Sequence, residues 1–321
     1  MKQILTLLIV LLGGLYGFAQ FTTDFTITDL NNEGLTNAVQ KSLNTLVNEL
    51  NNAHSAKRTP QLTGMNLDER TKQSILLLWE NSPFRCDETE IVEPGITSGN
   101  EYEVRNIPFI FTDLEKSDQY HEVAITFDGR GTLTSFHIAI SQNLQRQVLK
   151  TGASVKDARR RQIILDYVEQ FRTSYNTKDI TFLNQVFSED ALIITGKVVK
   201  VKPTPENNFV SSITKYSKQS KQSYINNLTR VFRNNKKIRV TFDDIKVLMH
   251  PTKSDWYGVT LHQGWSADRY HDEGWVFLLW DFTDEDHPTI HVRTWQPDKY
   301  DDGKDITEED IFGLDDCNIV D

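Results

Sequence analysis

The sequence is poor in cysteine and in positive charge. Its 321 residues include two cysteines, and no Cys-x-x-Cys pair or nearby Cys/His pair is present, which argues against a zinc site. Acidic residues outnumber basic ones by 45 to 35, and the formal net charge is −10. A chain with this charge repels nucleic acid rather than binding its phosphates. No Gly-x-Ser-x-Gly motif and no glycine-rich phosphate loop is present, so neither nucleophilic-elbow nor phosphate-loop chemistry has support.

The sequence does not decide whether its two cysteines form a disulfide. In an oxidising compartment Cys86 and Cys317 could pair and tie the C-terminal end of the chain to its first half. Their separation in the sequence says nothing about the distance between their Cα atoms. A Cys86–Cys317 disulfide and two free thiols therefore both remain alternatives.

Long apolar runs are confined to the N-terminal end. Lys2 precedes an apolar run at 4–15, and small residues follow at Gly17 and Ala19, which is the layout of a secretory signal peptide. The run is shorter than the roughly 20 residues that span a bilayer, so no stable membrane anchor is expected. We predict a signal peptide at 1–19, cleavage after Ala19, and export to the periplasm or the extracellular space.

Two halves of similar organisation follow. We predict an N-terminal α+β module at 20–145, a linker at 146–157, a second module at 158–300 and an acidic, solvated tail at 301–321. The polar stretch 202–224 is expected to be an exposed insertion. Helices followed by strands indicate the α+β class, with two modules of helices packed on a curved antiparallel sheet. The predicted helices are 34–53, 67–79, 158–175, 180–187 and 221–232. The predicted strands are 88–92, 101–111, 121–127, 133–140, 240–249, 257–265, 275–282 and 289–296, and a hairpin is predicted at 191–201.

The second half carries a family resemblance. The run RRRQIILDYVEQFRTSYNTKDITFLNQVFSEDALIITGKVV, with its Phe-x-x-Asp-Ala step at 187–191 and Gly196 in the next hairpin, resembles the opening of a nuclear transport factor 2-like (NTF2-like, SnoaL-like) domain. The strand HVRTWQP is similar to the closing strand of that cystatin-like α+β cone. The resemblance covers 158–297, and 34–141 resembles a more divergent copy. The exported tandem arrangement resembles envelope proteins of Bacteroidetes. Such domains include isomerases, dehydratases, ligand binders and assembly modules, so the fold alone does not settle the function.

Five of the six tryptophans lie between Trp256 and Trp295, on the last three predicted strands. Strand alternation places an apolar set on one face and a mixture of aromatic and titratable side chains on the other. Such a mixture is typical of a small-molecule pocket. The apolar set is Val259, Leu261, Val276, Leu278, Trp280, Ile290 and Val292; the mixed set is Thr260, His262, Trp275, Phe277, Leu279, Asp281, His291, Arg293 and Trp295. The candidate ligand-binding residues are Tyr257, His262, Trp275, Asp281, His291, Arg293 and Trp295.

The favoured function is non-enzymatic: binding of a small ligand or a protein partner in the cell envelope, through the NTF2-like pocket or the sheet face. No cofactor is expected. No metal is expected either, because the spacing of His262, Asp268, His271 and Asp272 matches no known metal motif.

Two alternatives remain. One is an isomerase or dehydratase with Asp281 as general base, His262 or Tyr257 as hydrogen-bond donor, and Arg293 holding an acidic substrate. The other is a structural subunit of an envelope assembly, with a homodimer formed through the sheet face.

Overall fold

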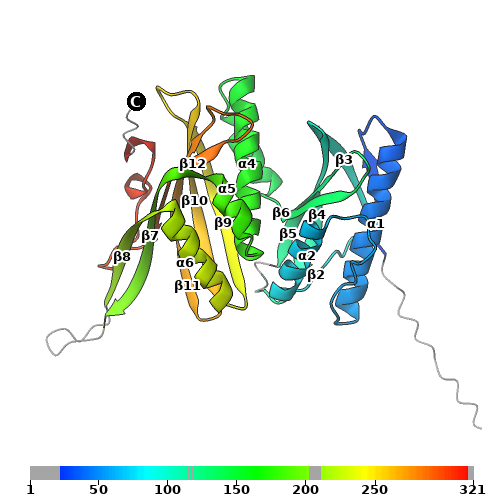
Figure 1. Ribbon diagram of the computed structural model, residues 1–321, viewed down its shortest axis with the longest axis horizontal. Helices are drawn as coiled ribbons and strands as arrows, with labels where there is room; N and C mark the ends of the chain where they lie inside the picture. The colour runs from blue at the N-terminus through cyan, green and yellow to red at the C-terminus, as the bar shows by residue number, and fades with distance from the viewer. Residues whose placement is uncertain (1–21, 115, 117–118, 202–210, 317–321) are drawn as a thin grey trace, which may run out of the picture.

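The computed structural model describes residues 22–114, 116, 119–201 and 211–316 (Figure 1). The predicted signal peptide at 1–19 and Cys317 lie outside these residues, so export and the disulfide remain predictions. Cys86 is buried in the first module. Within the described residues, no helix is long and apolar enough to cross a membrane.

The first module packs two helices on one face of a curved sheet. Apolar residues at helical spacing on the first helix, such as Val39, Leu43 and Leu50, are fully buried against this sheet. The strand order is β1-β3-β4-β5-β6, with β1 parallel to β3 and β2 paired with β4. The elements are β1 (Asp24–Thr28), α1 (Glu33–Ser55), α2 (Glu69–Asn81), β2 (Phe84–Arg85), β3 (Glu90–Ser98), β4 (Glu101–Phe111), β5 (Tyr120–Phe127) and β6 (Leu133–Ile138).

The second module has a six-stranded sheet in the order β8-β7-β12-β11-β10-β9, antiparallel except between β12 and β7. The predicted linker is mostly helical, since α3 ends at Lys150 and α4 begins at Val155. Part of the predicted insertion at 202–224 is strand β8, which pairs along β7. The elements are α3 (Gln142–Lys150), α4 (Val155–Asn176), α5 (Ile180–Val186), β7 (Phe187–Val201), β8 (Ser211–Ser220), α6 (Lys221–Asn234), β9 (Ile238–Met249), β10 (Trp256–Ala267), β11 (Tyr270–Asp281) and β12 (Thr289–Pro297). The predicted α+β class with two modules is confirmed.

Helix α4 stands between the two sheets, with β9 on one side and β6 on the other (Figure 1). Its apolar stripe, which includes Leu165, Val168 and Phe171, is buried in the core of the second module. Its other side meets the first module, and there Glu169 and Arg172 are also buried. The helix that builds the second core is therefore also the contact between the modules.

Candidate functional site

A β-bulge divides the tryptophan-rich face that strand alternation predicts. Leu279 pairs with Val292 and Trp280 pairs with Ile290, which leaves His291 as an extra residue in β12. Residues directly opposite each other on paired strands share a face. Arg293 lies opposite Leu278 and Trp295 opposite Val276, so both are on the core side and are buried. The assignment of Arg293 and Trp295 to the face of His262 and Asp281 was wrong, because an extra residue inverts the alternation beyond it.

Tyr257 also lies on the core side. It is 1% exposed, and its ring centroid is 5.6 Å from that of Phe282. Buried Arg293 stacks 5.6 Å from the centroid of the Tyr224 ring and donates a hydrogen bond to Gln263 at 3.3 Å. Tyr257 and Arg293 thus belong to a packed interior, whereas Trp295 is buried but lines a cleft of about 650 Å³ with Tyr216 and Tyr300.

His262 and Trp275 are neighbours on the outer face, with ring centroids 5.1 Å apart. The two ring nitrogens of His262 lie 3.0 Å from an oxygen of Asp243 and 3.1 Å from one of Asp298. The hydrogen bond with Asp243, and then that with Asp298, raises the pKa of His262 to about 9 against the opposing effect of burial. His262 is therefore a cation at neutral pH with both N–H groups engaged, and it has no donor left for a substrate.

Asp281 completes a turn at the end of β11. Its Oδ1 accepts hydrogen bonds from the backbone N–H of Thr283 at 2.7 Å and from the Thr283 hydroxyl at 2.5 Å. His291 lies 3.6 Å from its other oxygen. Neither of the two inter-module clefts described below is lined by Asp281. The outer-face candidates therefore do not converge on a cavity with Arg293 or Tyr257.

The C-terminal segment covers part of this outer face. The ring of Phe312 lies 5.5 Å from that of Phe277, and its backbone N–H donates to the Gln296 side chain at 2.8 Å. Leu314 packs so closely that a Cβ on Gly258 would lie 2.5 Å from it. The tail was predicted to be solvated; in its described part, 301–316, the acidic side chains are exposed, whereas Phe312 and Leu314 are partly buried on the sheet.

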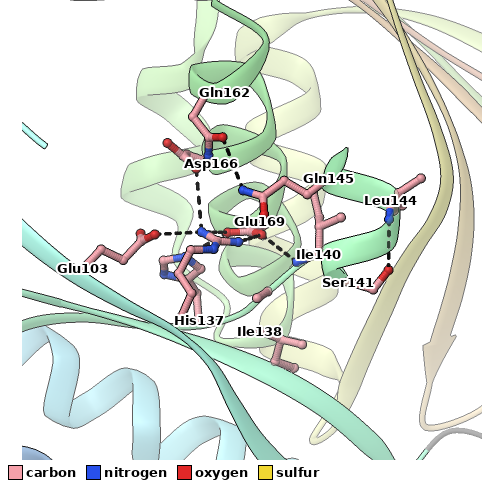
Figure 2. Close-up of polar contacts among 12 residues, drawn as sticks. Glu103, His137, Ile138, Ile140, Ser141, Leu144, Gln145, Gln162, Asp166 and Glu169 are labelled. Atoms are coloured by element: carbon pink, nitrogen blue, oxygen red, sulfur yellow. Dashed lines mark hydrogen bonds and ion pairs between the residues drawn. The ribbon is translucent and has the colours of Figure 1, made fainter. Parts of the chain in front are cut away.

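A large concave site lies between the modules instead. A cleft of about 1040 Å³ runs between the sheet of the first module and helices α4 and α2. We call it the Asp166 cleft. Figure 2 shows a cluster of charged side chains from β4, β6 and α4, of which Glu103, Arg105, His137 and Asp166 line the cleft.

Arg105 lines this cleft and is paired with Glu169, which is buried and does not line it. Nη2 of Arg105 lies 2.5 Å from one oxygen of Glu169, and its Nη1 donates to Glu103 at 2.9 Å. The other oxygen of Glu169 is 3.1 Å from Nε2 of His137, and the backbone N–H of Ile140 donates to Glu169 at 2.6 Å. Burial alone would raise the pKa of Glu169, but His137 and Arg105 hold it below its usual value. A fully buried, ionised Glu169 thus joins both modules.

Asp166 lies one helical turn before Glu169 and faces the cleft (Figure 2). Its carboxylate accepts a hydrogen bond from Gln162 at 2.8 Å and stands 3.8 Å from Arg105, so it lacks the direct pairing that Glu169 has. Burial, and then the negative charges of Glu169 and Glu103, raise the pKa of Asp166 to about 7. With its side chain 35% exposed, Asp166 is a carboxyl group that solutes can reach and that titrates at neutral pH.

These residues were not among the sequence candidates. Glu103 and Arg105 lie in the predicted strand 101–111, and Asp166 and Glu169 lie in the predicted helix 158–175. The available signal was a second stripe on that helix, with Asp166 and Glu169 at helical spacing. Charged stripes of this kind usually face solvent, so the pattern does not by itself indicate a site.

Comparisons with known proteins add a likeness of fold. No protein-family model matches the chain, and no curated protein matches it. An NTF2-like protein from Cytophaga hutchinsonii is 14% identical, with 43% of this chain and 97% of that chain covered and a TM-score of 0.31. An NTF2-like superfamily protein from Salmonella enterica is 14% identical, with 42% and 89% covered and a TM-score of 0.32. Bd1075 from Bdellovibrio bacteriovorus is 12% identical, with 63% and 78% covered and a TM-score of 0.34.

Solved structures named NTF2-like are thus among those similar to part of the chain, in line with the predicted resemblance. The second module has helices packed on a curved sheet that is antiparallel except between β12 and β7. At these identities the likeness carries no information on function.

Proposed function

We propose that this chain is an exported binding protein that holds a small cationic ligand, an amine with an apolar body, in the Asp166 cleft. The observation that carries this proposal is the accessible, weakly paired carboxyl group of Asp166 in a large cleft walled by both modules. A pocket of this size accommodates a small organic molecule, and a perturbed carboxyl in a cleft is a frequent mark of a functional site.

The charge of the cleft favours a cation. Its two guanidinium groups are already engaged: Arg105 by Glu103 and Glu169, and Arg70 by Asp179 at 2.7 Å. Carboxylates outnumber guanidinium groups in the lining by four to two. The four carboxylates are Glu101, Glu103, Asp166 and Asp179, against Arg70 and Arg105.

Aromatic side chains supply the apolar part of the wall. Tyr102 and Phe136 come from the first module, and Tyr167 and Phe182 from the second. Tyr167 is held by Trp280, with ring centroids 5.1 Å apart. Aromatic faces attract ammonium groups by roughly 0.5–2 kcal/mol, so this wall complements the carboxylates.

The test is calorimetric titration with phenylethylammonium, using phenylethanol and phenylacetate as the neutral and anionic analogues. Phenylethylammonium should bind most tightly. Its affinity should rise from pH 6 to pH 8, because Asp166 is charged only above its pKa of about 7. Asp166→Asn should weaken binding about tenfold, or about 1.4 kcal/mol. Asp281→Asn, outside the cleft, should leave it unchanged. Equal binding of all three compounds, or none at all, contradicts the proposal.

An acid–base enzyme is the second candidate, with Asp166 rather than Asp281 as the proton-transfer group. A carboxyl with a pKa near 7 is suited to general acid–base work at neutral pH. This hypothesis predicts that the protein exchanges the α-protons of a bound carbonyl compound in D2O and that Asp166→Asn abolishes the exchange. If a carbonyl compound binds in the cleft but its α-protons do not exchange, the acid–base hypothesis is contradicted and the binding function stands.

Export and assembly complete the proposal. Export rests on the layout of residues 1–19, and mass spectrometry of the protein from its native host should find a chain that begins at Gln20.

A homodimer through the outer sheet face would have to accommodate Phe312 and Leu314, which already cover part of it. Removal of residues 306–321 should therefore promote self-association in sedimentation if that face is a latent interface.

A further inference from the structure

A second cleft, of about 460 Å³, lies between the modules and shares no lining residue with the Asp166 cleft. We call it the Arg172 cleft. Its walls are the end of α2, strands β4 and β5 of the first module, the last turns of α4, and strands β9 and β10. Its size is within the range of small-molecule sites.

Arg172 lies in the wall of this cleft and is only 7% exposed. Its Nη2 donates hydrogen bonds to the backbone carbonyls of Ile138, at 2.5 Å, and Ala139, at 3.2 Å. Its Nε has no hydrogen-bond partner among the described residues. Those bonds position the guanidinium group but leave its charge without a counter-ion.

No carboxylate of the described residues forms an ion pair with Arg172. Glu169 is one turn away on α4, but its oxygens are taken by Arg105, His137 and the Ile140 N–H. Burial lowers the pKa of Arg172 to about 10, as expected for a cation without a paired anion. A buried charge of this kind is costly unless something pairs with it.

The rest of the lining suits an anion with an apolar body. Lys237 adds a positive charge and lies 3.8 Å from Asp113. Asp268 is held by the backbone N–H groups of residues 236 and 237. Apolar side chains supply most of the remaining surface. They include Leu78, Phe111, Ile138, Ile238 and Val240.

We propose that the Arg172 cleft binds a monocarboxylate with an apolar chain or ring, and that the carboxylate pairs with Arg172. Such a ligand would supply the missing counter-ion and bury its apolar part between the modules. The site is separate from the cationic site of the proposed function, and it takes a ligand of the opposite charge.

The experiment titrates the full chain with octanoate, using octanol and octylammonium as neutral and cationic controls of equal chain length. Octanoate should bind by calorimetry and raise the melting temperature. Octylammonium has the charge that the Asp166 cleft takes, so its binding should weaken in Asp166→Asn and stay unchanged in Arg172→Met. Arg172→Met should weaken octanoate binding at least tenfold, and Arg172→Lys should retain part of it. Arg130→Met removes an exposed cation from a turn, and it should leave octanoate binding unchanged.

Ser266→Trp provides a test that keeps Arg172 in place. Ser266 is a partly exposed residue of β10 that lines the cleft, so a tryptophan there should fill the space and block octanoate. The proposal is overturned if octanol binds as tightly as octanoate, if Ser266→Trp binds octanoate like the unmodified chain, or if octanoate does not bind at millimolar concentration.

Discussion

The two buried sides of α4 differ in what they require of their surroundings. On the side of the second module, Leu165, Val168 and Phe171 pack among apolar residues of β9–β12 and α6. On the side of the first module, Glu169 and Arg172 are nearly as buried, but they need specific partners. Apolar burial is non-directional, whereas a buried charge is tolerated only with a counter-charge or hydrogen bonds in place. The polar side should therefore be more sensitive to a small chemical change than the apolar side.

Glu169→Gln should give the largest loss of folding stability. It removes the fully buried counter-charge of Arg105, which keeps the partly buried Glu103, with little change in volume. The loss of one partner of a buried pair costs about 3–5 kcal/mol. Urea denaturation should show a correspondingly lower free energy of unfolding. The double variant Arg105→Met with Glu169→Met should cost much less than the sum of the two single changes, because it removes both charges of the buried pair together. Strictly additive losses would mean that the pair does not act as a unit.

Val168→Ala should give the next largest loss of stability. It removes two methyl groups from a fully buried site on the apolar side, which costs about 2 kcal/mol, including the cavity left behind. Urea denaturation measures this loss too. If Val168→Ala is as damaging as Glu169→Gln, the contrast between the two sides of α4 is not one of charge.

Asp166→Asn should give a small effect that depends on pH. The folded-state pKa of Asp166 is about 7, above its usual 3.8, so the folded protein binds this proton more tightly than the unfolded chain does. The stability that this proton contributes is complete below pH 4 and is lost as the pH rises to about 7. Asparagine does not titrate, so Asp166→Asn should raise the melting temperature by about 2–4 °C at pH 8 and by almost nothing at pH 4. The shift at pH 8 is small because solvent screens this partly exposed side chain. Calorimetric scans at both pH values test this, and an equal shift at the two would exclude titration of Asp166 as the cause.

The fold was largely predictable from local pattern. The apolar stripe at 158–175 and the alternation at 275–282 indicated a helix on a sheet, and α4 and β11 have those positions. The site was not predictable in this way. Arg105 and Glu169 are 64 residues apart and belong to different modules, and nothing local in either segment indicates the other. The bulge at His291 likewise has no signal in its own residues, although it decides which side of the sheet Arg293 faces.

The sequence by itself determined the α+β class, the two modules and the apolar sides of their helices, because these follow from periodicities of a few residues. The tertiary structure alone decided which charged residues became buried. Strand pairing set the face of Arg293, and the docking of the first module on α4 enclosed Glu169, Asp166 and Arg172. The physical reason is that the environment of a charge depends on its neighbours in space, and those neighbours come from distant parts of the chain.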